Sequence, residues 1–131
     1  MIVGNLAPAF VHSFAVNASN NAGNTGSTAV AYGTTGNDTF FGKAADEVFI
    51  GKGGNDTYVF SGNFGNDTIT DFHASTNVVQ FDHNTFSDFA SVMTHAAQVG
   101  SDVVISVDAH NSLSLHNTLI AQLAANNFHF A

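Results

Sequence analysis

Four acidic residues recur at near-regular intervals in the middle of the chain: Asp38, Glu47, Asp56 and Asp67. Each lies in a glycine-containing stretch, where the backbone can adopt turns that place several carbonyl oxygens around one point. Calcium takes six to eight oxygen ligands of these two kinds in a loose geometry, whereas magnesium demands a strict octahedron and zinc prefers Cys or His. The pattern therefore predicts a calcium-binding region with Ca²⁺ as its cofactor.

The acidic residues belong to a repeated nonapeptide, GTTGNDTFF, GKAADEVFI, GKGGNDTYV and GNFGNDTIT, which starts at Gly33, Gly42, Gly51 and Gly62. The sixth position of each repeat is acidic, and the eighth position is bulky and apolar. A period of nine fits a turn of six residues followed by a strand of three. Two such units make one coil, and stacked coils bury the face that a single coil leaves exposed.

Stacking of the coils predicts two edges on which carboxylates meet. Asp38 should lie near Asp56 on one edge, and Glu47 should lie near Asp67 on the other. The two carboxylates of each pair repel one another unless a hard cation lies between them. An array of metal-free hairpin turns is the alternative, because Asn and Gly favour such turns. That array would not require a carboxylate at the same place in every turn.

The repeats resemble those of the repeats-in-toxin (RTX), hemolysin-type calcium-binding proteins, whose repeat is G-G-x-G-x-D-x-U-x. The resemblance implies a right-handed parallel β-roll with calcium between the turns of neighbouring coils. It implies a first site of Gly33, Thr35, Asp38, Gly54 and Asp56, a second of Gly42, Ala44, Glu47, Asn63, Gly65 and Asp67, and a third of Gly51, Gly53, Asp56 and Asp71. The sequence departs from the pattern at the second glycine, which is Thr34, Lys43, Lys52 or Asn63, and at Ala45.

The amino-acid composition argues against several classes of binding partner. The 131 residues carry a net charge of −8 with two basic residues, and 44% are hydrophobic. Such a chain cannot neutralise a nucleic-acid backbone, and an anionic membrane would repel it. No apolar run approaches the roughly 18 residues of a membrane span. The chain contains no Cys, so a bound metal is the expected substitute for disulfides.

Catalytic motifs are absent from the sequence. The seven His residues are scattered and form no H-E-x-x-H motif, and there is no G-x-S-x-G or P-loop sequence. We therefore expect a protein that is not an enzyme.

The chain divides into three predicted regions. Residues 1–32 are an Asn-, Gly-, Ser- and Thr-rich leader or linker whose edges, 9–16 and 29–32, could each form a short strand. Residues 33–72 hold the calcium-binding repeats. Residues 73–131 are a carboxy-terminal cap with strands over 77–81, 103–107 and 113–116, a helix from a Ser87 cap to about Gln98, and a helix over 119–125 capped by Thr118.

The amino terminus lacks the positive and continuous apolar regions of a secretory signal. This agrees with the resemblance, which implies an uncleaved type I secretion signal within residues 102–130. The predicted fold is mainly all-β, a short right-handed parallel β-roll of about two coils with a β-rich cap that contains one or two short helices.

The predicted function is an extracellular bacterial calcium-binding module whose folding is coupled to calcium after type I secretion. Its expected partners are calcium ions and the type I secretion machinery. One alternative is a calcium-dependent structural protein that self-assembles at a surface or in a matrix. Another is a non-catalytic carboxy-terminal module of a secreted hydrolase or epimerase.

Overall fold

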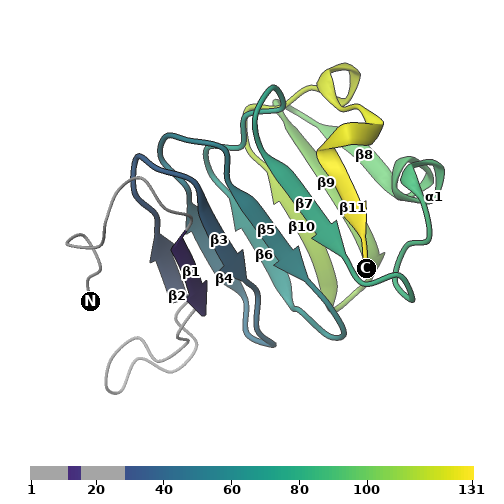
Figure 1. Cartoon of the computed structure of the whole chain (residues 1–131). Coiled ribbons are helices and arrows are strands. Elements are labelled where there is room, and N and C mark those ends of the chain that lie inside the picture. Colours follow the sequence, from purple (N-terminus) through teal and green to yellow (C-terminus); the bar gives the residue numbers. More distant parts are fainter. Residues whose placement is uncertain (1–11, 16–28) are drawn as a thin grey trace.

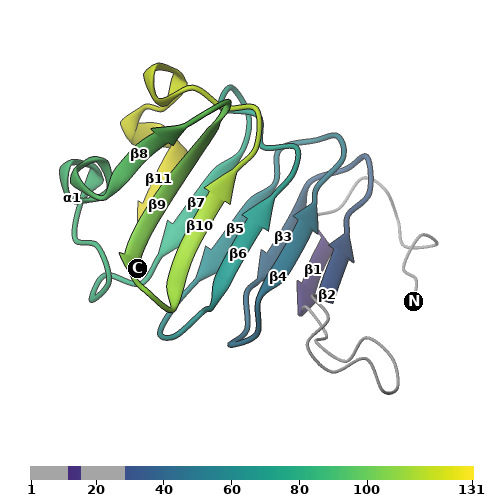
Figure 2. The ribbon, with the colours of Figure 1, turned by 180° about the vertical axis from the view of Figure 1, so that it is seen from behind.

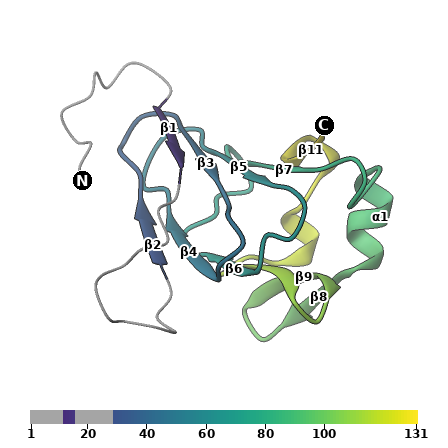
Figure 3. The same ribbon diagram turned by 90° about the horizontal axis from the view of Figure 1, so that it is seen from below.

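A computed structural model describes residues 12–15 and 29–131 of the chain. Two sheets face each other, and between residues 29 and 81 short strands alternate between them, so the chain crosses from one sheet to the other after each strand (Figure 1). The view from below shows the two rows of strands with the core between them (Figure 3). This arrangement is the parallel β-roll that the nonapeptide period predicts.

The first sheet has five strands in the order β1-β3-β5-β7-β11, and every neighbouring pair is parallel. Its strands are β1 His12–Ala15, β3 Asp38–Phe41, β5 Thr57–Phe60, β7 Val78–Phe81 and β11 Phe128–Phe130.

The second sheet has six strands in the order β2-β4-β6-β10-β9-β8 (Figure 2). The first four strands are parallel to one another, and the last two pair antiparallel. Its strands are β2 Ala29–Tyr32, β4 Glu47–Ile50, β6 Asn66–Ile69, β8 Ala96–Val99, β9 Asp102–Asp108 and β10 Asn111–Leu115.

The eighth position of every repeat points into the core, as predicted. These four side chains, Phe40, Phe49, Tyr58 and Ile69, are fully buried. The parallel register places Phe40 opposite Tyr58 in one sheet and Phe49 opposite Ile69 in the other. The rings of Phe40 and Tyr58 are stacked with their centroids 5.0 Å apart. Each buried side chain of this size contributes about 1.5–3 kcal/mol, so the aromatic stack is a main source of the roll's stability.

The two extra residues before the fourth repeat do not shift its register. β6 pairs with β4 as if the period were unbroken, with Val48 opposite Thr68. The added length lies at the end of β5 and in the connection to β6, where Phe60, the last residue of β5, and Phe64 in the connection are both buried. Their rings pack with centroids 5.3 Å apart, so the insertion adds core material within the connection.

The roll continues beyond the four repeats at both ends. β1 and β2 precede the repeats and pair with β3 and β4. β7, β10 and β11 follow the repeats and extend the same parallel ladders. The four repeats supply the two central coils, and flanking sequence without the repeat pattern supplies the rest. The predicted loop over residues 17–28 lies outside the described residues.

The carboxy-terminal region closes one end of the roll with β8, β9 and three short helices. The hairpin expected over 103–107 and 113–116 is present as β9 and β10. The helix expected from Ser87 to Gln98 is shorter. α1 spans Phe89–Thr94 and its cap is Asp88, whose carboxylate accepts a hydrogen bond from the Ser91 N–H at 2.8 Å.

Two further details of the predicted helices were wrong. Residues 96–99 pair with β9 as strand β8, because edge pairing competes successfully with a short helix. The helix expected over 119–125 is two 3₁₀ turns, η1 Ile120–Gln122 and η2 Ala125–Asn127. Thr118 does not cap it, because its hydroxyl donates to the His116 carbonyl oxygen. No helix within the described part of the chain is long and apolar enough to cross a membrane.

Candidate calcium sites

The first candidate site lies where the turn of residues 33–38 stacks on the turn of residues 51–56. The Asp38 N–H donates to Oδ1 of Asp56 at 2.9 Å, so the two carboxylates lie on the same edge, as predicted. A methyl group placed on Gly53 would lie 3.3 Å from the Thr35 carbonyl oxygen. A Cβ on Gly54 would overlap the Gly36 carbonyl group. Backbone carbonyls and carboxylates therefore converge in this turn pair.

Asp38 is held by its own turn. The Thr34 N–H donates to Asp38 Oδ2 at 2.7 Å, and the Thr34 hydroxyl donates to Asp38 Oδ1 at 3.0 Å. Gly33, the first residue of the repeat, lies against this carboxylate, since a Cβ there would be 2.5 Å from Asp38 Oδ2. Thr34 occupies the second glycine position, and its contribution was not anticipated from the sequence.

The second candidate site repeats this geometry on the opposite edge. The Glu47 N–H donates to Asp67 Oδ1 at 2.8 Å, and the Lys43 N–H donates to Glu47 Oε1 at 2.8 Å. A Cβ on Gly42 would lie 3.4 Å from Asp67 Oδ2, and one on Gly65 would lie 2.8 Å from the Ala44 carbonyl oxygen. The structure thus brings together five of the six residues predicted for this site, namely Gly42, Ala44, Glu47, Gly65 and Asp67.

Asn63, the sixth predicted residue of the second site, lies at its rim. It lines a small polar cavity with Ala44, Gly65, Asp108, His110 and Asn111. Its side-chain oxygen faces the Asn111 amide nitrogen at 3.5 Å, so its side chain contacts the cap.

The third candidate site involves Asp71, which follows β6. Asp71 Oδ1 accepts a hydrogen bond from the Gly51 N–H at 2.9 Å, and Oδ2 accepts one from the Lys52 N–H at 2.8 Å. Lys52 stands at the second glycine position and has a φ of 67°, which is unusual for a residue with a side chain. Asp71 therefore lies against the same turn as Asp56, as the resemblance implied.

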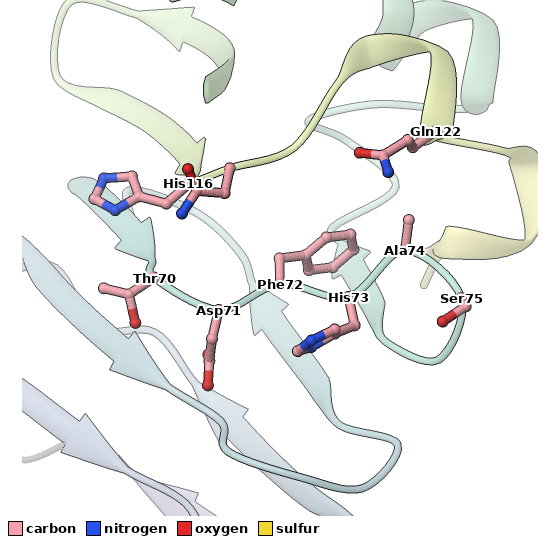
Figure 4. A pocket seen from close by; sticks show the side chains of 9 residues that line it. Thr70, Asp71, Phe72, His73, Ala74, Ser75, His116 and Gln122 are labelled. Carbon is pink, nitrogen blue, oxygen red and sulfur yellow. The ribbon is translucent and has the colours of Figure 1, made fainter. Parts of the chain in front are cut away.

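A cavity of about 430 Å³ adjoins Asp71 beyond the carboxyl ends of β6 and β10 (Figure 4). Asp71 and His73 point to one side of the loop, and the Phe72 ring points to the other. The phenyl ring is buried in the core. This loop therefore anchors itself through Phe72 while it presents Asp71 to the turn of the third repeat.

Three buried carboxylates have an oxygen without a protein partner. Among the described residues, Oε2 of Glu47, Oδ2 of Asp56 and Oδ2 of Asp67 are buried and accept no hydrogen bond. The three residues are at most 1% exposed. A buried carboxylate oxygen without a partner is costly, and a bound cation removes that cost. These orphaned oxygens, together with the convergent carbonyls, fit a hard divalent cation such as calcium.

Burial also raises the pKa values of these groups. Desolvation is the largest cause, and it raises the pKa of Asp56 to about 7 and that of Asp67 to about 8. The Asp38 charge adds to the shift at Asp56, and the Glu47 charge adds to the shift at Asp67. Desolvation likewise raises the pKa of Glu47, while the Lys43 N–H lowers it. Ionisation of these carboxyl groups is therefore unfavourable when no cation is bound beside them.

Side chains alone do not define these sites. The part of the chain that the structure describes has no cluster of three or more His, Asp or Glu side chains able to hold a metal ion. At the first two candidate sites, carboxylates instead lie together with backbone carbonyls of the neighbouring turn. This composition is the one that calcium accepts and that zinc does not.

Two asparagines contact the turns of the repeats from the flanking strands, and sequence reasoning missed both. Asn77 follows Asp38 and Asp56 in the parallel register. Its amide nitrogen reaches the Gly54 carbonyl oxygen at 3.4 Å. On the other edge, Asn111 Oδ1 accepts from the Gly65 N–H at 3.0 Å. A neutral amide can satisfy a turn without a cation. Asn77 is the first residue of the strand predicted over 77–81, and Asn111 ends the polar stretch before the strand predicted over 113–116, so nothing in the repeat pattern marked either one.

The comparisons with known proteins agree with this geometry. Residues 25–58 match the model of the RTX calcium-binding nonapeptide repeat (4 copies). The chain thus carries RTX calcium-binding nonapeptide repeats, as the sequence predicted. The match starts upstream of Gly33 and ends at Tyr58, before the repeat that begins at Gly62.

The fold is similar to that of the extracellular lipase LipA from Serratia marcescens, with a TM-score of 0.57 and 21% sequence identity. The alignment covers 95% of this chain and 20% of the lipase chain. At this level of identity the similarity concerns the fold. No match was found among curated proteins.

Proposed function

We propose that this protein is a calcium-binding β-roll module that completes its folding when calcium binds. The observation that carries the proposal is the set of three buried carboxylate oxygens, each without a hydrogen-bond partner among the described residues. All three belong to the sixth position of a repeat, where calcium ligands were predicted. The matching repeat family supports the choice of ion.

The residues that would hold calcium are those that the stacked turns bring together. Asp38 and Asp56 would serve the first site with carbonyls of Gly33, Thr35 and Gly54. Glu47 and Asp67 would serve the second with carbonyls of Gly42, Ala44, Asn63 and Gly65, and Asp71 would complete a third with Asp56, Gly51 and Gly53. Calcium would neutralise carboxylates that otherwise repel one another. At ten times the dissociation constant, one ion stabilises a fold by about 1.4 kcal/mol.

Extracellular calcium sites have dissociation constants of about 10⁻⁴–10⁻³ M. Two or three such sites would supply roughly 3–4 kcal/mol at ten times that concentration, which is a large share of the 5–15 kcal/mol stability of an ordinary domain. The same sites would be empty in a calcium-poor cytoplasm. The module would therefore be loosely folded inside the cell and would fold outside it.

Far-ultraviolet circular dichroism tests this coupling. Starting from the chain in chelator, addition of calcium is expected to increase the β signal, and equal magnesium is expected to leave it unchanged. The reason is that magnesium holds its water and accepts irregular carbonyl geometry poorly. A β signal that is already complete in chelator would contradict the proposal.

We further propose that the module is secreted and is not itself catalytic. Residues 73–131 would combine the cap with a type I secretion signal, and the parts of residues 1–32 outside β1 and β2 would be a leader or linker. The similarity in fold to an extracellular lipase, of which this chain matches 20%, favours a module within a longer secreted enzyme. That activity would belong to other parts of such a protein.

Export can be measured with a reporter fused ahead of the chain in a host that has a type I secretion system. The fusion is expected in the culture medium with its carboxy-terminal residues still attached. A matched fusion that ends at residue 72 should stay in the cells. Equal secretion of the two fusions would contradict the assignment of the signal to residues 73–131.

A further inference from the structure

Tyr58 brings a polar atom to a position that the repeat reserves for apolar side chains. The equivalent residues of the other repeats are Phe40, Phe49 and Ile69. Tyr58 is fully buried and stacks on Phe40, with the ring planes inclined by 6°. Packing therefore accounts for the ring, but it does not account for the hydroxyl group.

The hydroxyl group of Tyr58 has no hydrogen-bond partner among the described residues. Buried tyrosine hydroxyls usually find a partner, because an unpaired hydroxyl in the core is costly. The equivalent ring atom of Phe40, Cζ, lies near the first glycine of its own repeat, Gly33. The Tyr58 ring lies in the same way against its own repeat, so its hydroxyl group lies next to the first glycine of that repeat, Gly51.

Two unpaired oxygens meet at Gly51. A Cβ on this residue would overlap the Tyr58 hydroxyl, and it would lie 2.5 Å from Asp56 Oδ2. Both oxygens therefore crowd the same face of Gly51 and are a few ångströms apart. They are chemically complementary, since a neutral hydroxyl can donate and a carboxylate oxygen can accept. Burial, followed by the charges of Asp56, Asp71 and Asp38, raises the pKa of Tyr58, so its proton stays on the hydroxyl.

We propose that the Tyr58 hydroxyl donates a hydrogen bond to Asp56 Oδ2 and positions this carboxylate for calcium. The inference rests on the proposed calcium-binding function. A carboxylate oxygen has two lone pairs, so Oδ2 can accept from the hydroxyl while it binds the ion. Asp56 Oδ1 is already fixed by the Asp38 N–H. The hydroxyl and Oδ2 are unpaired in the described structure, so this bond would form as calcium binds and would hold the second oxygen of the carboxylate toward the ion.

The position of Asp56 means that this bond would affect more than one candidate calcium site. Asp56 faces Asp38 in the preceding coil, and its turn also carries the Gly51 and Lys52 N–H groups that Asp71 binds. Two candidate sites therefore share this one carboxylate. Tyr58 is a positioning residue in this account, because it acts on calcium through Asp56.

Calorimetric titration of the full chain with calcium tests the assignment. Tyr58→Phe keeps the ring and removes the hydroxyl. Partners that orient metal ligands are typically worth about 10–100-fold in affinity, and we expect a loss of about tenfold. Tyr32→Phe is the matched control, since it removes the other tyrosine hydroxyl from an exposed side chain. It should leave calcium affinity unchanged.

A spectroscopic readout separates positioning from packing. The chain has two Tyr and no Trp, so Tyr58 is the single tyrosine of the Tyr32→Phe variant. Calcium is expected to shift the near-ultraviolet tyrosine band of that variant as the hydroxyl gains a charged acceptor. This measurement does not depend on whether Tyr58→Phe folds.

The outcomes distinguish this inference from the proposed function. Wild-type affinity in Tyr58→Phe, or an unchanged tyrosine band on calcium binding, would overturn the role of Tyr58 and leave calcium binding intact. If the wild-type chain takes up no calcium, the proposed function fails and this inference fails with it. A tenfold loss together with the spectral shift would establish both.

Discussion

Replacing Asp56 with asparagine is expected to change the stability of the roll in opposite directions with and without calcium. In the calcium-free protein, Asp56→Asn removes a buried charge whose pKa burial raises to about 7. The amide oxygen can still accept the Asp38 N–H, so the fold keeps its inter-coil bond. At pH 8 we expect a gain on the order of 2 kcal/mol.

With saturating calcium the same substitution is expected to destabilise the roll. Asn keeps a carbonyl oxygen but loses the negative charge that two candidate sites would share. Loss of one to two ions at a hundred times their dissociation constant costs about 3–5 kcal/mol, which exceeds the gain of about 2 kcal/mol from removing the buried charge. Urea unfolding with and without calcium measures the change in unfolding free energy under each condition. The dependence of that free energy on urea concentration reports whether the same amount of surface is exposed on unfolding.

The pH dependence of the calcium-free protein follows from the same charges. The pKa of Asp56 rises from 3.8 to about 7, and that of Asp67 rises from 3.8 to about 8. Between these values the folded state binds more protons than the unfolded state, so stability falls as the pH rises. The stability that these two protonated carboxyl groups contribute should be fully present below about pH 4 and lost by about pH 8. Asp56→Asn should make this decline shallower.

Asp46→Asn is the matched control for both measurements. Asp46 is exposed in a neighbouring turn, and its oxygen accepts a hydrogen bond from the Asn66 N–H, which asparagine can also do. It should be close to neutral with and without calcium. If Asp56→Asn destabilises the calcium-free protein, the buried carboxylate is stabilising and the argument from burial is wrong.

Gly54→Ala is expected to disrupt the stacking of coils even at saturating calcium. Gly54 has a φ of 87°, which costs an L-residue about 1–2 kcal/mol. Its Cβ would also overlap the Gly36 carbonyl group of the preceding coil, and backbone cannot move aside as a flexible side chain can. We expect a loss of more than about 3 kcal/mol in urea unfolding, since strain and overpacking add.

Gly62→Ala separates the two causes. Gly62 has a φ of 60°, but a Cβ there would have nothing within 4 Å. It should therefore cost about 1–2 kcal/mol from backbone strain alone. Equal losses in Gly54→Ala and Gly62→Ala would show that the close approach of the coils contributes nothing.

The repeat made the central part of this fold predictable. Glycine turns, an acidic sixth position and an apolar eighth position each occur in four copies, and they agree on one register. That agreement located the strands β3 to β6 and the two carboxylate edges. The resemblance to the RTX repeats, rather than the repeat pattern itself, placed Asp71 against the turn of Gly51.

The flanks were harder to predict because their strands lack the repeat. β7, β10 and β11 join the parallel ladders without the glycine turns of the repeat, and Asn77 and Asn111 take over the turns with neutral amides. The helix was predicted too long because Phe89, Val92, Met93 and Ala96 have helical spacing. Spacing cannot show that Ala96 finds a strand partner in Ile105.

The sequence singled out carboxylates and turn residues that the structure brings together, but it missed the side chains that support those carboxylates. Thr34 and Tyr58 both act on a carboxylate of the repeat, and neither stands at a position that the pattern marks as polar. The distances that define their roles arise from one coil stacked on another, which a one-dimensional pattern does not describe.

The spacing of the inter-coil bonds also governs how the chain finds its structure. The bonds between neighbouring turns join residues 18 to 20 positions apart, as for Asp38 with Asp56 and Glu47 with Asp67. Each added coil therefore closes a loop of the same modest length, and the entropy of closure does not accumulate as the roll lengthens. The bond from Gly65 to Asn111 spans 46 positions, so the cap is the slow, long-range step of folding.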